Sequence, residues 1–127
     1  MTLTVGILGG GQLARMMALA GAPLGLRFRV VDAAKDACAS QVAPHLCADY
    51  TDLPAMEAFA KTVDVVTFDF ENVPAATASY LAARVPVFPN PRALAVAQDR
   101  IEEKQLFKRL GLGTAAFAAV DSREDLD

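Results

Sequence analysis

Short apolar runs alternate with helical patterns along this chain. The first run, residues 5–8, ends in three glycines and predicts a buried parallel strand followed by a tight turn. Apolar residues then recur at helical spacing, which predicts a helix over about 12–20 that stops at Gly21 and Pro23. A second strand is expected over 28–31, with Asp32 at its carboxyl end.

The rest of the chain continues the alternation. Residues 33–43 predict a loop with a short helix. The further elements expected are a strand over 45–48, a helix over 53–61 capped by Asp52, a strand over 63–68, a helix from Pro74 to about 84, a short strand over 85–88, a long helix over 94–110 ending at Gly111, and a strand over 115–120. Strands that alternate with helices predict an α/β fold, a Rossmann-like parallel sheet with helices on both faces.

The turn at 89–91 and the pattern that follows it indicate a domain boundary. We predict one domain over 1–95 and the beginning of a second over 96–127. The chain ends just after 122–125, which is typical of a helix start, so we expect it to be truncated.

Composition narrows the class of protein. The chain has 127 residues, 54% hydrophobic and 21% charged, which excludes disorder, and its net charge of -3 without a basic stripe argues against nucleic-acid binding. No leader or membrane-spanning run is visible, so we expect a cytoplasmic protein. The spacing of Cys38 and Cys47 fits no metal motif and predicts two reduced thiols, and the single His45 predicts no zinc site.

The segment Gly9-Gly10-Gly11-Gln12-Leu13-Ala14 matches G-x-G-x-x-A between a strand and a helix. Glycine allows a tight turn and close approach of a ligand, and the helix start offers free N–H groups to an anion. We therefore expect phosphate binding here. The alternative is a glycine-rich turn that only lets the helix pack.

Asp32 lies about twenty residues past the glycines. In NAD enzymes an acidic residue at this place holds the ribose hydroxyls, so an NAD-type dinucleotide-binding domain of a dehydrogenase is a competing interpretation. Asp32 could equally be a loop acid or a cap.

Polar residues crowd the end of the strand at 63–68, in the segment Asp69-Phe70-Glu71-Asn72-Val73-Pro74. Strand alternation would point Asp69 and Glu71 the same way, at the sheet edge where α/β proteins bind ligands. The alternative is that Glu71 or Asn72 caps the next helix. Segment 98–104 is explained by a solvated charged helix face, although Arg100 could clamp a phosphate.

Taken together, these segments resemble the N5-carboxyaminoimidazole ribonucleotide synthetases, a family of the ATP-grasp superfamily. The resemblance rests on residues 7–16, on Phe70-Glu71-Asn72-Val73-Pro74, on Gln98-Asp99-Arg100 with Glu103-Lys104, and on 110–115. The chain departs from the family at Ala14, where glycine is usual, and at Asp69, where glutamate is frequent. Because of the second departure, the predicted site does not include Asp69.

The resemblance implies a pre-ATP-grasp domain followed by the start of an ATP-grasp domain. It implies a ligase that uses ATP and Mg²⁺ to join bicarbonate to aminoimidazole ribonucleotide, and a homodimer. Gly11, Gln12, Leu13 and Glu71 would bind the ribonucleotide, and Arg100 would bind ATP. The Mg²⁺ ligands and catalytic groups are expected beyond residue 127, so this chain alone should be inactive.

Overall fold

The structure is a computed structural model that describes residues 2–126. Four parallel strands form its sheet, in the order β3-β2-β1-β4. The strands are β1 (Thr4–Leu8), β2 (Arg27–Asp32), β3 (His45–Cys47) and β4 (Val65–Phe68), and the α-helices are α1 (Gln12–Gly21), α2 (Leu53–Ala60), α3 (Ala75–Ala82), α4 (Pro91–Gln98) and α5 (Arg100–Arg109). Short 3₁₀ helices occupy Ala22–Leu24 (η1), Cys38–Gln41 (η2) and Arg123–Leu126 (η3).

Two apolar clusters cover the two faces of the sheet, which confirms the predicted α/β fold with helices on both faces. One cluster joins Ile7 and Val30 of the sheet to Ala14 and Ala18 of α1. The other packs α2, α3 and α4 on the opposite face, and its members are Leu8, Val31, Met56, Phe59, Ala60, Val66, Val73, Ala78, Leu81, Val85, Val87 and Leu94. Adjacent strand residues such as Ile7 and Leu8 therefore pack on opposite faces of the sheet.

The strand register brings the carboxyl ends of β1, β2 and β4 to one edge. Leu8 of β1 pairs with Val31 of β2 and with Phe68 of β4. The loops that leave these strands, beginning at Gly9, Ala33 and Asp69, consequently meet at the carboxyl edge of the sheet.

Several local predictions are confirmed. The Asp52 side chain caps α2 by accepting the Ala55 N–H at 3.0 Å. Gly111, with φ of 71°, follows α5, where its N–H donates to the Lys108 carbonyl and the Leu112 N–H donates to the Phe107 carbonyl. This pair of bonds is a Schellman motif, which needs a left-handed residue at this place.

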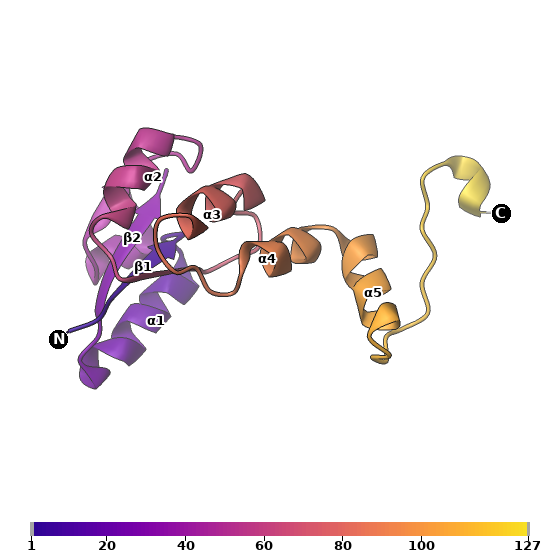
Figure 1. The fold of residues 1–127 in the computed structure, drawn as a ribbon, viewed down its shortest axis with the longest axis horizontal. Helices are drawn as coiled ribbons and strands as arrows, with labels where there is room; N and C mark the ends of the chain where they lie inside the picture. Colours follow the sequence, from indigo (N-terminus) through magenta and orange to yellow (C-terminus); the bar gives the residue numbers. More distant parts are fainter. Residues whose placement is uncertain (1, 127) are drawn as a thin grey trace.

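Three predicted elements differ from the structure. The long helix over 94–110 is wrong, because Asp99 is extended (φ −114°, ψ 114°) and separates α4 from α5. The strand over 85–88 shrinks to a single bridge between Val87 and Val66, flanked by Pro86 and Pro89. No strand forms over 115–120, where the chain runs without a neighbouring strand (Figure 1).

The chain leaves the sheet after α4. Figure 1 shows α4 beside α3, α5 beyond α4, and the segment after α5 running still further from the sheet. No residue of α5 is fully buried. The predicted division into 1–95 and 96–127 remains a prediction, although α5 lies outside the body built on the sheet.

Candidate functional site at the carboxyl edge of the sheet

The glycine loop crosses the carboxyl end of β1. Gly9 has φ of 110°, a backbone conformation that residues other than glycine rarely adopt. Its N–H donates to the Val31 carbonyl at 2.9 Å. Gly11 then precedes α1 without a side-chain cap. The predicted strand–turn–helix context of the glycine motif is confirmed.

Asp32 holds this loop from the β2 side. Its Oδ2 accepts the Gly10 N–H at 2.8 Å, and its Oδ1 accepts the Ala34 N–H at 2.8 Å. The Tyr50 hydroxyl donates to Oδ2 at 3.5 Å, and burial together with the charges of Asp32 and Asp69 raises the pKa of Tyr50. In this structure Asp32 acts as a loop acid, since both of its oxygens accept hydrogen bonds from backbone N–H groups of the chain.

Asp69 holds the same loop from the β4 side. Its Oδ2 accepts the Gly11 N–H at 3.1 Å, while its Oδ1 is buried without a hydrogen-bond partner in the described residues. Burial raises the pKa of this carboxyl, against the opposing effect of the Gly11 and Ala14 N–H groups. Asp69, which sequence reasoning left out, thus contacts the predicted binding residue Gly11 directly, and its signal was its place as the first residue after β4.

The two carboxylates change what the glycine loop can bind. The N–H groups of Gly10 and Gly11 are the donors that the motif would offer to a phosphate, and both already donate to Asp32 and Asp69. A phosphate brought here would have to displace a carboxylate and would meet two negative charges. The arrangement favours a ligand group that donates hydrogen bonds, such as a hydroxyl or an amine.

Gln12 and Leu13 begin α1 beside this loop, and both are exposed. The Cys38 thiol donates to Gln12 Oε1 at 3.2 Å, and both cysteines are free thiols, as predicted. Leu13 lines a cavity of about 480 Å³ whose other walls are Met16, Met17, Ala20, Phe68 and Asp69. Gly11, Gln12 and Leu13 therefore lie at one edge with Asp69.

Glu71 lies on the other side of Asp69. It helps to line a second cavity of about 370 Å³, which is bounded by Phe68, Asp69, Phe70, Pro89, Ala93, Leu94 and Ala97. The two cavities share Phe68 and Asp69, so Asp69 stands between Leu13 and Glu71. Pro74 occupies the N-cap of α3 without a side-chain cap bond, so the structure does not show Glu71 or Asn72 as a cap.

The structure does not bring Arg100 to this edge. Arg100 is the first residue of α5, beyond α4, and its exposed guanidinium pairs with Glu103 one turn along the helix. Asp99 fixes the start of α5, since its Oδ1 accepts the N–H groups of Ile101 and Glu102 at 2.8 and 3.0 Å.

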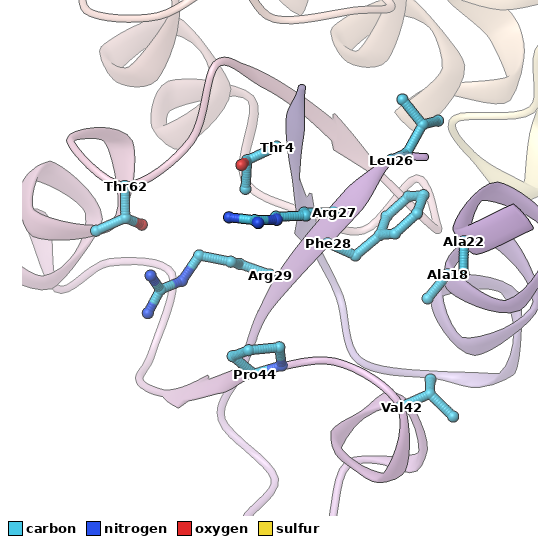
Figure 2. Close-up of a pocket in the computed structure, with 10 residues that line it drawn as sticks. All are labelled: Thr4, Ala18, Ala22, Leu26, Arg27, Phe28, Arg29, Val42, Pro44 and Thr62. Atoms are coloured by element: carbon cyan, nitrogen blue, oxygen red, sulfur yellow. The ribbon is translucent and has the colours of Figure 1, made fainter. Parts of the chain in front are cut away.

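A further cavity, of about 480 Å³, lies at the opposite end of the strands (Figure 2). Arg27 and Arg29 extend from β2 on the side of Thr62, whereas Phe28 extends toward α1. Parallel sheets of this kind bind ligands at the carboxyl ends of their strands, which is the edge that carries the glycine loop.

Metal and membrane signals are absent from residues 2–126. No group of three His, Cys, Asp or Glu side chains in that range could hold a metal ion. The helices of the same range are all too short or too polar to cross a membrane. The lone His45 instead makes a hydrogen bond between Nε2 and the Asp32 carbonyl at 3.0 Å.

A family model described as the ribonucleotide synthetase preATP-grasp domain matches residues 1–98. The chain belongs to this family. The match confirms the resemblance found in the sequence and favours it over the dehydrogenase interpretation of the glycine motif.

Relatives agree with this placement. The N5-carboxyaminoimidazole ribonucleotide synthase of Pseudomonas aeruginosa is 50% identical over 125 residues, which cover 98% of this chain and 35% of the relative. The crystal structure of N5-carboxyaminoimidazole ribonucleotide synthetase from Thermus thermophilus matches with a TM-score of 0.90 and 50% identity, over 96% of this chain and 34% of that one.

The N5-carboxyaminoimidazole synthase of Aspergillus clavatus, solved in complex with ADP and 5-aminoimidazole ribonucleotide, matches with a TM-score of 0.80 and 30% identity, over 91% of this chain and 31% of that one. This chain spans about a third of the length of these three relatives.

Proposed function

We propose that this chain forms the ribonucleotide-binding part of an ATP-dependent carbon–nitrogen ligase of de novo purine biosynthesis. The ligase carboxylates 5-aminoimidazole ribonucleotide with bicarbonate to N5-carboxyaminoimidazole ribonucleotide. The observation that carries the proposal is the likeness to the Aspergillus clavatus structure, a protein that binds both ADP and 5-aminoimidazole ribonucleotide.

The proposed reaction has two steps. Bicarbonate attacks the γ-phosphorus of ATP, which releases ADP and leaves carboxyphosphate. The exocyclic amine of the ribonucleotide then attacks the carboxyl carbon, the C–O bond to phosphate breaks, and the amine loses a proton. The products are the N5-carboxyamino ribonucleotide, ADP and phosphate.

The residues of this chain would bind and orient the ribonucleotide. The loop at Gly11, Gln12 and Leu13 and the side chain of Glu71 would contact it on the two sides of Asp69. Carboxylates at this edge suit the hydroxyl and amine donors of a ribonucleotide, since charge-assisted hydrogen bonds are the stronger ones. The phosphate of the ribonucleotide would lie away from Asp32 and Asp69.

ATP and Mg²⁺ complete the proposal. Arg100 would balance nucleotide phosphate charge, for which a guanidinium is well suited. Residues 2–126 contain no group of three candidate metal ligands. When bound to ATP, the metal would screen the phosphate charges.

Assembly and location are part of the same proposal. We place the enzyme in the cytoplasm as a homodimer, consistent with the two free thiols and with an exposed apolar stripe of Leu13, Met16 and Leu19 on α1. Light scattering in solution distinguishes dimer from monomer.

The test is a chimera in which this chain replaces the matching residues of the Pseudomonas aeruginosa relative. We expect ATP- and bicarbonate-dependent consumption of 5-aminoimidazole ribonucleotide, with ADP released in step. A folded chimera that releases no ADP under these conditions would refute the proposal.

A further inference from the structure

Gln98, the last residue of α4, reaches back to the loop between β4 and α3. Its Nε2 donates to the Glu71 carbonyl at 2.7 Å and to the Val73 carbonyl at 2.6 Å. Both partners are acceptors, so the nitrogen and not the oxygen of the amide must face them, and both of its N–H groups are used. One side chain thus ties the backbone on either side of Asn72.

Apart from the contact of the Phe70 ring with Tyr50, the other anchors of this loop lie at its ends. The Asp69 N–H donates to the Leu8 carbonyl at 3.1 Å, and the Val73 side chain is fully buried in the core. Glu71 and Asn72 between them are exposed. The bonds from Gln98 therefore set the backbone from which the Glu71 side chain projects.

Gln98 is also held firmly within α4 and is followed almost at once by α5. Leu94, which is 2% exposed, fixes α4 in the core, and Asn90 caps α4 by accepting the Ala93 N–H at 2.9 Å. Asp99 then turns the chain and caps α5. Arg100 begins α5 two residues after Gln98, so the chain passes from the residue that bonds the Glu71 loop directly into the helix that carries the proposed nucleotide contact.

We propose that Gln98 is a positioning residue that holds the Glu71 loop in a fixed relation to the start of α5. The ribonucleotide contact at Glu71 and the nucleotide contact at Arg100 are then assembled together by one side chain. This role rests on the proposed function, whereas the link itself rests only on the contacts of Gln98.

Gln98→Glu is the sharpest substitution, because it keeps the size of the side chain and removes both donors. A carboxylate would face two carbonyl oxygens and swing away. Gln105→Glu, at an exposed glutamine on α5, adds the same charge and is the matched control.

The first measurement is hydrogen exchange by NMR on the 127-residue chain. We expect the Nε2 protons of Gln98 to exchange more slowly than those of Gln105. Gln98→Glu should shift the carbonyl carbon signals of Glu71 and Val73, the two acceptors of the link, and Gln105→Glu should leave both unchanged. Equal exchange of the two side-chain amides, or unchanged carbonyl signals in Gln98→Glu, would overturn the link.

The second measurement is kinetic, in the active chimera. Gln98→Glu should lower kcat/KM for the ribonucleotide on the order of tenfold to a hundredfold, since misplacing a reacting group by about 1 Å has effects of that size. Gln98→Lys, which restores a donor, should recover part of the loss, and Gln105→Glu should have wild-type kinetics. A Gln98→Glu chimera with unchanged kinetics would overturn the positioning role.

The two measurements separate this inference from the function on which it rests. The NMR measurement on the 127-residue chain does not depend on enzyme activity. It therefore decides whether Gln98 makes the link even if the unsubstituted chimera is inactive. An inactive unsubstituted chimera counts against the proposed ligase and thereby against the positioning role, while protected Gln98 protons would still establish the link.

Discussion

Asp69 occupies the space that a side chain on Gly9 would need. A Cβ built on Gly9 would lie 1.7 Å from Asp69 Oδ1, and Gly9 has φ of 110°. The loops after β1 and β4 therefore pack closely at this point, because Gly9 has no side chain and the carboxylate of Asp69 fills that space. The position of Asp69 against the glycine loop follows from this contact and from its bond to the Gly11 N–H.

Gly9→Ala should destabilise the chain by more than about 2 kcal/mol, because the unfavourable backbone conformation alone costs on the order of 1–3 kcal/mol and the clash adds to it. The free energy of unfolding in urea measures the effect. Gly113→Ala is the control, since its Cβ would meet no atom within 4 Å. It should change stability by less than about 0.5 kcal/mol, and equal effects of the two changes would contradict the contact.

The pKa of Asp69 predicts a pH dependence of stability. Burial raises this pKa in the folded chain, so the folded state binds the proton more tightly than the unfolded state. The contribution of this proton to the free energy of unfolding is fully present below the pKa that Asp69 has in the unfolded state. It is lost as pH rises through the pKa that Asp69 has in the folded state.

Asp69→Asn removes that titration. The stability of Asp69→Asn relative to wild type should therefore increase as pH rises from about 4 toward neutrality, within the range where carboxyl groups titrate. Urea unfolding at a series of pH values measures this difference. A difference that stays flat, or that falls with rising pH, would show that Asp69 is not the buried carboxyl described.

Asp32 should act on stability through the loop that it holds. Asp32→Ala removes the acceptor of the Gly10 and Ala34 N–H groups, and we expect a loss of about 2 kcal/mol, in the range for hydrogen bonds to charged groups. Asp36→Ala, at an exposed acid in the loop after β2, should stay within about 0.5 kcal/mol of wild type. If both changes had the same small effect in urea unfolding, Asp32 would be a solvated loop residue.

Glu71 tests the site itself. Glu71→Gln in the active chimera should reduce kcat/KM for the ribonucleotide by the value of one charge-assisted hydrogen bond, about 1.5–3 kcal/mol, without changing the melting temperature. Glu124→Gln, at an exposed acid far along the chain, should have wild-type kinetics. Unchanged kinetics in Glu71→Gln would make Glu71 a surface acid only.

The order of strands and helices along the chain could be read from the sequence, because periodicity reports burial directly. The apolar run that ends at Gly9 and the helical repeat after Gln12 each specify one element without reference to the rest of the chain. The predicted strand over 115–120 was wrong because periodicity does not report pairing. An apolar run becomes a strand only beside a neighbouring strand, and none lies next to these residues.

The break at Asp99 was missed because the helical pattern continues on both sides of it. The available signal was local: Asp99 is followed by Glu102 and Glu103, which is the composition of a capped first turn. A cap inside a continuous amphipathic pattern is easily hidden, and the tie from Gln98 to the loop after β4 could not be read from sequence at all.

The site was predicted in part. The loop at Gly11, Gln12 and Leu13 and the segment after β4 do come to one edge, as parallel strands require. The strand alternation expected to align Asp69 and Glu71 does not reach them, because β4 ends at Phe68, although both residues line one cavity. Asp69 turns inward to the glycine loop while Glu71 remains exposed.

The most direct test of the account is an NMR titration of the 127-residue chain with 5-aminoimidazole ribonucleotide, with NAD as the parallel ligand. We predict that the ribonucleotide shifts the amide signals of Gly11, Gln12, Leu13 and Glu71, and that NAD shifts none of them. Shifts with NAD at the glycine loop, or ribonucleotide shifts confined to residues away from this edge, would contradict the proposed site.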